Sequence, residues 1–579
     1  MAAPNALLQV DLDAGESRIE EIAAEVEDRF VGGRGLGAYL VSFLPPEILP
    51  LQPTAGVALC IGPLAGLGIP GTARVTLSAK SPLTGTILDS NSGSAIAAIL
   101  AAQGLRAIFL TGKAREPSYL LIKEGRAEVL SARELWGKPT AAAFEWLKKH
   151  HPSAAAMAIG PAGETGVLFA NVICGDYGAF GRGGLGAVLG SKNIKALVFN
   201  PPYGYASSAR TARDWKARIR ELPLIKHGLT KYGTVPLLKL MAQLGMLYSS
   251  THAERLRLSQ EADSIETVAY GCGGCTVLCK RRSRKNNAPV KYQSLWALGA
   301  QNRELSIDMA QQAAALCDEL GMDAVSAGST LGCAKLLAER GLLDEEMREA
   351  VGMGLPVALE KIACREGPWR RLGEGSSRLA AACGDEGAAS VVKGMELPGF
   401  DPRGVPELAL SYATSNRGAC HTRGVAPLDA IKDSFSTLDP RMVVGRVIEG
   451  QDWEAAMDTL MLCRFVAEGL GKEEAASLCS AGLGRAVGVE KLSLLGARVW
   501  NLERCYNLAA GIDPSQDSLP DALLTDPRHK AELRELLRNY YELRGWSPEG
   551  RPEPALLERL DLSNWTGVCE GPPSRQGAE

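Results

Sequence analysis

The chain has 579 residues, more than one hydrophobic core supports, so roughly two to four domains are expected. Hydrophobic residues make up 46% and charged residues 22%, and the formal net charge of −3 argues against nucleic acid as the main partner. The amino terminus has no basic segment followed by an apolar one, and no apolar stretch is long and unbroken. We therefore expect no export signal, no membrane span and a cytoplasmic protein with reduced cysteines.

The first 205 residues are typical of a β-rich domain with a few helices. Short apolar runs end at glycine, proline or a charged residue, which indicates strands and turns. Two stretches with helical spacing, near residues 93–104 and 139–150, interrupt them. The runs that predict strands lie at residues 6–12, 56–62, 74–79, 106–114, 118–125 and 155–161.

From about residue 206 apolar residues recur at helical spacing, which predicts two mainly helical domains. A segment rich in proline and glycine, residues 394–410, is the best break between them. The expected fold is therefore α+β, with domains at 1–205, 206–400 and 401–579. No repeat of fixed period is evident. Helical patterns lie at residues 209–222, 308–321, 329–341, 345–363, 453–470, 489–511 and 527–546.

Three glycine-rich loops lie in the first domain, at residues 32–37, 89–93 and 181–186. Glycine lets backbone N–H groups approach a phosphate closely, and an arginine fork adds bidentate charge. Each loop alone is a weak signal, because glycine clusters are more often plain turns. Because no acidic residue completes a dinucleotide fingerprint, we do not predict a Rossmann fold.

Cys272, Cys275 and Cys279 form the sharpest local motif, in the sequence CGGCTVLC. Three thiolates at this spacing can hold three corners of an iron–sulfur cubane, and the neighbouring glycines let the backbone bend around it. The fourth ligand must then come from elsewhere in the chain. Zinc is the main alternative, although no second cysteine or histidine pair accompanies the motif, and three unliganded thiols are the other.

A basic run, residues 280–285, follows the last of these cysteines. It is either a solvated charged loop or a basic rim that steers an acidic electron carrier toward the cluster. The sequence alone does not separate these two interpretations.

His421 differs from the other five histidines in its surroundings. It lies among small residues between Arg417 and Arg423, in SNRGACHTRG. Such a segment has little bulk with which to build a core, so its polar groups are expected to face a cavity. A histidine there could exchange a proton near neutral pH, although a structural histidine with satisfied hydrogen bonds is the alternative.

Motifs along nearly the whole chain resemble those of the aldehyde:ferredoxin oxidoreductases, tungsten enzymes with two pterins. The motifs occur in the family's order, and several are too long for chance similarity. They are GGRGLGAYL, IGPLAG, SAKSPLTGTILDSNSG, AIGPAGE, GRGGLGAVLGSKNIKAL, CGGCTVLC, DELGMD, RGACHTRG, DTLMLCRF, NLERCYNLAAGIDPSQDSLP and YYELRGWSPEG.

The resemblance implies that an N-terminal domain of two β-sheets forms the base for the pterins and that two mainly α-helical domains cover it. It implies a 4Fe–4S cluster held by Cys272, Cys275, Cys279 and Cys463, beside a tungsten or molybdenum atom on two pterins. A magnesium ion is expected between the pterin phosphates near Asn91. The residues that match pterin or phosphate positions are Arg74, Asn91, Gly93, Arg182, Gly183, Asp318, Met322, Asp323, Arg423, Asp458 and Leu462.

Two positions depart from the family's pattern. Met461 stands where the family usually has glycine. Gln293, after Tyr292, occupies the place of a glutamate thought to assist at the metal, and a glutamine can hydrogen-bond but cannot act as a base. His421 matches the family's histidine beside the metal. The catalytic roles therefore fall to His421, for proton transfer, and to Gln293, for orienting the substrate or a metal-bound oxygen.

The resemblance predicts an enzyme that interconverts an aldehyde and a carboxylic acid. Electrons would pass through the cluster to ferredoxin or to an iron–sulfur partner subunit, in an oligomer or a complex. The alternative is a tungsten-dependent reductase of an aromatic acyl-coenzyme A, of the class II benzoyl-coenzyme A reductase type, which the missing glutamate favours somewhat. A third hypothesis is a relay or scaffold subunit that has kept the cluster and lost the metal.

Overall fold

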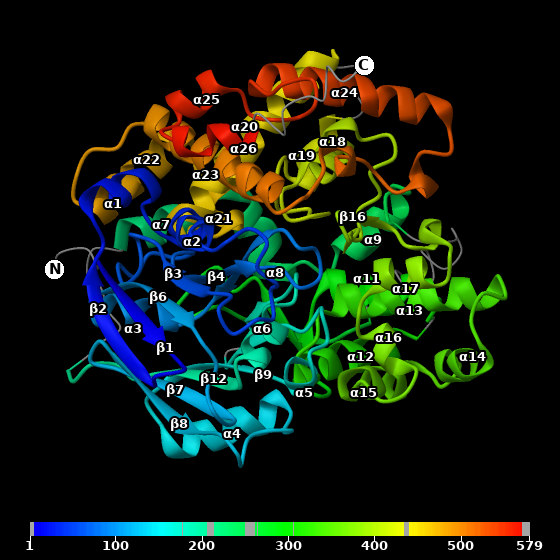
Figure 1. Cartoon of the computed structure of the whole chain (residues 1–579), viewed down its shortest axis with the longest axis horizontal. Coiled ribbons are helices and arrows are strands. Elements are labelled where there is room, and N and C mark those ends of the chain that lie inside the picture. The colour runs from blue at the N-terminus through cyan, green and yellow to red at the C-terminus, as the bar shows by residue number, and fades with distance from the viewer. Residues whose placement is uncertain are drawn as a thin grey trace, which may run out of the picture.

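The computed structural model describes residues 5–175, 178–204, 213–248, 261–262, 264–304, 306–433 and 439–569. It confirms the α+β fold, because two six-stranded sheets precede a mainly helical region. In Figure 1 the sheets lie at the lower left, the green helices beside them and the orange-to-red helices above. The expected boundary at 205–206 and the start of the helix expected over 209–222 lie outside the described residues.

The two sheets of the N-terminal region have the same strand order. The first runs β2-β1-β6-β3-β4-β5 and the second β8-β7-β12-β9-β10-β11. In each sheet one central pair, β1–β6 or β7–β12, is parallel, and the other neighbours pair antiparallel. The strands are β1 (Ala6–Asp11), β2 (Glu16–Glu21), β3 (Val57–Ile61), β4 (Arg74–Lys80), β5 (Ile87–Gly93), β6 (Leu105–Thr111), β7 (Ser118–Lys123), β8 (Arg126–Ser131), β9 (Ala155–Ile159), β10 (Val172–Cys174), β11 (Ala179–Phe180) and β12 (Ile194–Phe199).

This shared order makes the N-terminal region a structural repeat that has no fixed period in the sequence. The equivalent strands β5 and β11 have seven and two residues, so the repeats differ in length. All six strands and both helices expected from the sequence are present, and the other six strands of the two sheets were not expected. One hydrophobic core serves both sheets and includes α3 (Ile96–Ala102) and α6 (Leu185–Ser191).

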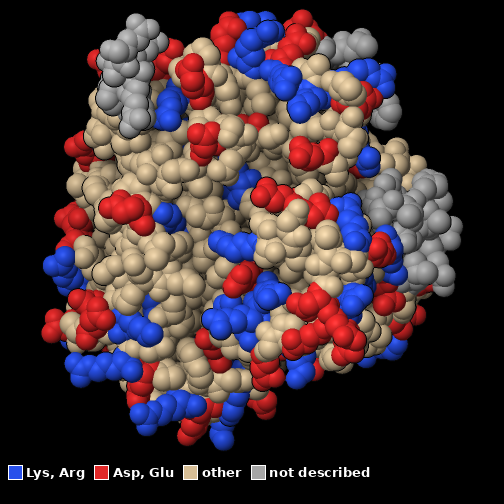
Figure 2. Space-filling model, turned by 45° about the vertical axis from the view of Figure 1, so that its right-hand side comes forward, with Lys and Arg blue, Asp and Glu red and all other residues tan. Residues whose placement is uncertain are grey.

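The later helices pack beside and above the sheets (Figure 1). No helix in the described ranges is long and apolar enough to cross a membrane. On the face shown in Figure 2, acidic and basic side chains are interspersed, as expected from the small net charge. The other elements are α1 (Ala24–Phe30), α2 (Gly33–Ser42), α4 (Thr140–His150), α5 (Pro161–Thr165), α7 (Arg213–Glu221), α8 (Thr230–Tyr232), α9 (Leu237–Gln243), β13 (Thr267–Tyr270), β14 (Lys280–Ser283), β15 (Pro289–Val290), α11 (Tyr292–Leu298), α12 (Ile307–Leu320), α13 (Ala324–Glu339), α14 (Glu345–Val351), α15 (Leu355–Cys364), α16 (Trp369–Leu372), α17 (Ser376–Ala382), β16 (Val391–Val392), β17 (Met395–Glu396), α18 (Pro406–Thr414), α19 (Pro427–Asp433), α20 (Pro440–Leu460), α21 (Arg464–Ala467), α22 (Lys472–Leu483), α23 (Val489–Ala509), α24 (Pro527–Arg544), α25 (Pro554–Arg559) and α26 (Thr566–Cys569).

Two joints between helices, residues 318–323 and 458–463, have the same backbone geometry. Helix α12 is capped by Gly321 and α20 by Met461, and both caps lie in the left-handed region, with φ of 74° and 56°. The N–H after each cap donates to the carbonyl oxygen five residues earlier, at 2.8 and 3.0 Å. This is the hydrogen bond that closes a left-handed helix end.

Each joint packs against the end of one of two equivalent strands. Strands β3 and β9 both end at an isoleucine that is followed by Gly-Pro. A Cβ on Gly62 would lie 2.1 Å from the carbonyl oxygen of Leu460, and one on Gly160 would lie 2.3 Å from that of Leu320. Both positions therefore require glycine, and the sheets fix where the two joints lie.

The left-handed conformation of Met461 is one that favours glycine, the residue that the resemblance implies there, and it gives a testable prediction. Met461→Gly and Met461→Ala both remove a buried side chain, but only glycine relieves the left-handed strain, which costs about 1 kcal/mol for other residues. We expect the glycine variant to unfold at the higher temperature in calorimetry. Gly321→Ala is the matched control and should lower the unfolding temperature, because the added Cβ would lie 2.5 Å from the Gly160 nitrogen. An alanine variant at 461 as stable as the glycine variant would contradict this account.

Candidate active site

The structure brings four cysteines together from two distant parts of the chain. Cys272, Cys275 and Cys279 lie in the loop between β13 and β14, and Cys463 directly precedes α21. Burial raises the pKa of the Cys279 thiol to about 12, and the other three thiols add to this rise, so all four are close neighbours. A metal centre bound here must displace thiol protons.

Zinc and an iron–sulfur cubane differ in how far apart they hold their ligands. Four thiolates around one zinc lie about 3.8 Å apart, given Zn–S bonds of about 2.3 Å. Among the described residues, no group of three or more histidine, cysteine or acidic side chains is close enough to hold a single metal ion. Four convergent thiols, three from one loop and one from a distant segment, are the ligand set that an iron–sulfur cubane uses.

The cysteine site is joined to the first sheet through the ends of β4 and β5. Arg74 and Gly93 are register partners at those ends. A Cβ on Gly93 would lie 2.2 Å from the Cys272 sulfur, so only glycine fits. Burial raises the pKa of Cys463, and the charge of Arg74 opposes that rise. Two expected cofactor contacts thus lie directly beside the cysteines.

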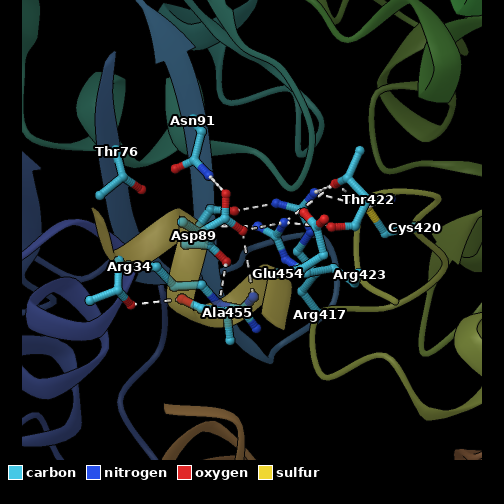
Figure 3. A network of polar contacts seen from close by, with 12 residues as sticks. Arg34, Thr76, Asp89, Asn91, Arg417, Cys420, Thr422, Arg423, Glu454 and Ala455 are labelled. Carbon is cyan, nitrogen blue, oxygen red and sulfur yellow. Dashed lines mark hydrogen bonds and ion pairs between the residues drawn. The ribbon is translucent and has the colours of Figure 1, made fainter. Parts of the chain in front are cut away.

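A buried ionic network includes Asp89 and Asn91 of β5, the strand that ends at Gly93 (Figure 3). Arg423 pairs with Asp89 and, at 2.8 Å, with Asp458. Asn91 donates to the same Asp458 carboxylate at 2.8 Å. Arg34 lies 3.5 Å from Asp89 and 3.6 Å from Asp458. The network thus joins the first sheet, helix α2, the end of α20 and the loop that contains His421.

The charges in this network stabilise one another. Burial alone would raise the pKa of Asp89, but Arg423, Arg34 and Arg417 outweigh it and hold that pKa well below its usual range. Glu503 on α23 accepts both arms of the Arg34 fork at 2.7 Å. Such bidentate pairs fix a guanidinium in one orientation.

The second joint carries a similar polar group. Arg182 lies 3.4 Å from Asp323 and donates to the carbonyl oxygens of Ala419, at 2.9 Å, and Glu396, at 2.7 Å. Gly183 has a φ of 91°, a left-handed conformation that favours glycine. Because Ala419 precedes His421 by two residues, both polar groups meet at this loop.

The other three expected cofactor contacts have different surroundings. Asp318 pairs with Lys291, at 2.8 and 3.0 Å. Met322 is buried, and its carbonyl oxygen accepts from Asn171 at 2.8 Å. Leu462 belongs to the apolar core under α20. Met322 and Leu462 could therefore contact a cofactor only through their main-chain groups or their apolar side chains.

The loop before α18 contacts both His421 and Gln293 and so brings them close together. Gln293 accepts from the Gly399 N–H at 2.9 Å. The next residue, Phe400, has its ring centroid 5.5 Å from that of His421. Burial, and then the charges of four arginines (Arg464, Arg182, Arg417 and Arg423), lower the pKa of His421 to about 3, so its imidazole is neutral at physiological pH.

Enclosed polar atoms without a partner mark where a bound group fits. Asn91 Oδ1, Gln293 Nε2, His421 Nδ1 and Arg417 Nε have no hydrogen-bond partner within the described part of the chain. Buried polar atoms are rarely left unpaired, because each costs about 1–3 kcal/mol. Acceptors, donors and arginines with spare N–H groups suit a phosphorylated, polar cofactor such as a pterin.

Family models match both parts of the chain. The model described as aldehyde ferredoxin oxidoreductase, N-terminal domain, matches residues 7–201, and the one described as domains 2 and 3 matches residues 210–562. The chain belongs to the aldehyde ferredoxin oxidoreductase family. The resemblance expected from the motifs is confirmed, and the chain is an oxidoreductase.

Similar proteins cover nearly the whole chain. The tungsten-containing aldehyde ferredoxin oxidoreductase of Pyrococcus furiosus is 34% identical, over 96% of this chain and 98% of its own length. The aliphatic sulfonate oxidoreductase, WOR-like subunit, of the same organism is 27% identical, over 96% of both chains. A solved structure of the active site complex BamBC of benzoyl coenzyme A reductase with 1,5-dienoyl-CoA has a TM-score of 0.84, with 21% identity over 98% of both chains, and supports the fold.

Some members of the network in this aldehyde ferredoxin oxidoreductase family protein were not assigned from the sequence. Arg34 and Asp89 were expected only as parts of glycine-rich loops, which is wrong for both, because Arg34 lies in helix α2 and Asp89 in strand β5. Both charged side chains are buried, with 1% of Arg34 and 5% of Asp89 exposed. Burial would have marked them as site residues, but it cannot be read from such short segments of sequence. The glycines beside Arg34 serve backbone packing, because a Cβ on Gly33 would lie 2.4 Å from the Asp458 carbonyl oxygen.

The basic run after the cysteines is only partly a charged surface. Arg281 is buried and donates to backbone carbonyl oxygens of Leu229 and Thr230. Arg282 lies 4.1 Å above the Tyr270 ring, and Lys285 pairs with Asp308 at 2.8 Å. Neither expectation for this run holds for all its members, because β14 turns alternate side chains inward.

Proposed function

We propose that this chain is a tungsten or molybdenum bis-pterin oxidoreductase that interconverts an aldehyde and a carboxylic acid. Electrons would pass through one 4Fe–4S cluster to ferredoxin or to an iron–sulfur partner subunit. One observation carries the proposal. The polar pairs at the two helix joints, Asp458 with Arg423 and Asp323 with Arg182, meet at the loop that contains His421. Four thiols converge beside them. The names of the relatives, tungsten-containing aldehyde ferredoxin oxidoreductases, agree with it.

The residues that would hold each group follow from their positions. Cys272, Cys275, Cys279 and Cys463 would ligate the cluster. One pterin would be held from the first joint's side by Arg423, Asn91, Asp458 and Arg74, with Gly93 and Leu462 against it and magnesium near Asn91. The other would be held by Arg182, Gly183, Asp323, Asp318 and Met322. When bound, the metal–pterin centre supplies two-electron exchange with the substrate, and the cluster supplies one-electron transfer to the partner.

His421 and Gln293 would act on the substrate itself. His421 Nδ1 would accept a hydrogen bond, and transiently a proton, from a hydrated aldehyde. Because its pKa is about 3, the imidazole would pass that proton on at neutral pH and not hold it, unlike the histidine expected from the sequence. Gln293 Nε2, which has no partner among the described residues, can donate to the substrate's carbonyl oxygen and so orient it. Its Oε1 is held by Gly399, which fixes the amide's direction.

One observation favours a second candidate, reduction of an aromatic acyl-coenzyme A. Gln293 offers a neutral donor where a carboxylate base is expected for aldehyde oxidation. The BamBC likeness concerns the fold, so it does not choose between the two substrates.

The two candidates are separated by an anaerobic assay of the purified holoenzyme. We expect benzaldehyde or acetaldehyde to reduce benzyl viologen, with no dye reduction in the absence of aldehyde. Reduced viologen and benzoyl-coenzyme A form the second arm, with the dearomatised thioester measured by chromatography. Turnover of benzoyl-coenzyme A without any aldehyde oxidation would replace the first candidate by the second.

A further inference from the structure

Glu454 is a buried carboxyl group that the proposed mechanism does not use. It lies on α20, one helical turn before Asp458, and is 6% exposed. Four charged side chains surround Glu454. Arg464 begins α21 and Glu468 follows its end, Asp458 lies on α20 itself, and Arg423 lies in the loop that contains His421. In Figure 3 it lies beside Arg423, at the edge of the ionic network.

Arg464 connects Glu454 to the candidate active site but does not neutralise it fully. Its guanidinium lies 3.7 Å from the Glu454 carboxylate, beyond hydrogen-bond distance. The closer contact, 2.7 Å, is with Glu468. Nη1 and Nη2 of Arg464 each also donate to a carbonyl oxygen, that of His421 at 3.3 Å and that of Gly424 at 3.2 Å. Glu454 therefore shares its nearest cation with Glu468 and two backbone carbonyl oxygens.

This arrangement leaves Glu454 with a charge that changes close to neutral pH, as does the charge of the Cys420 thiol, whose pKa the neighbouring arginines lower to about 6. Burial raises the pKa of Glu454 to about 7; Arg464 and Arg423 oppose the rise, while Asp458 and Glu468 add to it. Asp89 and Arg423 are far from titration at neutral pH, because each stabilises the other's charge. A negative charge added nearby would raise the pKa of all three groups, but of these only Glu454 titrates close enough to neutral pH to bind a proton as a result.

We infer that Glu454 takes up one proton from solvent when the adjacent redox centre gains an electron, and releases it when the electron leaves. No bond to substrate forms or breaks, and the electron comes from the substrate or from the electron partner. The uptake keeps the net charge of the buried site constant, so it lowers the electrostatic cost of reduction. The inference rests on the proposed redox function.

The test is the pH dependence of the centre's midpoint potential in the holoenzyme, followed by the tungsten or molybdenum signal in electron paramagnetic resonance. We expect the midpoint potential of the unmodified protein to fall as the pH is raised above the Glu454 pKa, because only the reduced state then keeps the proton. In Glu454→Gln that fall should disappear, since the amide is similar in size but cannot titrate. Proton uptake on reduction, measured with an indicator dye, should decrease with it.

Two variants complete the test. Glu454→Asp should retain the pH dependence, which a merely structural role of the side chain would not predict. Glu468→Gln, the matched control on the same arginine, should retain proton uptake, because Glu468 is more exposed. A normal metal signal with unchanged pH dependence in Glu454→Gln would overturn the inference. Absence of any metal or cluster signal in the unmodified protein would instead overturn the proposed function.

Discussion

Replacing Cys463 by alanine is expected to remove the iron–sulfur cluster while the chain still folds. A cubane needs four ligands, and the other three lie in a loop that Cys463 faces from the start of α21. The thiol is only partly buried, so its loss leaves no large cavity. Iron content should fall from about four per chain toward zero, together with the brown colour.

The control for this change is Cys317→Ala. Cys317 is fully buried near the end of α12, at the equivalent joint, but in an apolar core away from the three cysteines of the loop. We expect it to keep its iron. A normal cluster in Cys463→Ala, measured by iron analysis and visible absorption, would show that the fourth ligand is another residue.

His421→Ala is expected to lose about 10²–10⁴-fold in turnover and to keep metal and cluster. Its imidazole contacts Phe400 and has an unpartnered Nδ1 within the described residues, so it contributes more to proton transfer than to packing. Metal analysis of the variant separates loss of chemistry from loss of cofactor. Retained turnover with the best substrate would remove His421 from the mechanism.

Gln293→Glu is the companion change, and its outcome depends on the substrate. If the chain oxidises aldehydes without the carboxylate, the variant should keep or raise that activity. If the chain is adapted to another substrate, the added charge in an enclosed site should depress the native reaction while any aldehyde activity rises. Rates unchanged for both substrates would mean that Gln293 Nε2 does not face the reacting centre.

The sequence predicted the class of fold well because the signals were local. Six apolar runs in the first domain all became strands, since each has the period and the terminating residues of a strand. The shared order of the two sheets was not visible, because it depends on pairings between distant strands and not on residue spacing. Domain boundaries stay a prediction.

The candidate site shows the same division. The loop cysteines were found from spacing, whereas Cys463 came only from the family resemblance, because nothing near it in the sequence marks a ligand. Arg34 and Asp89 could not be assigned, since their importance lies in burial against Asp458 and Arg423 from far along the chain. Met461 was noted as a departure, and its left-handed backbone supplied the physical reason.

The most direct test of the central claim is metal and pterin analysis of the purified chain. The account predicts about four irons per chain from the cubane and one tungsten or molybdenum. Two pterins should be released per chain on denaturation, detected by the fluorescence of their oxidised products. Stoichiometric zinc without iron, or iron without any pterin, would contradict it.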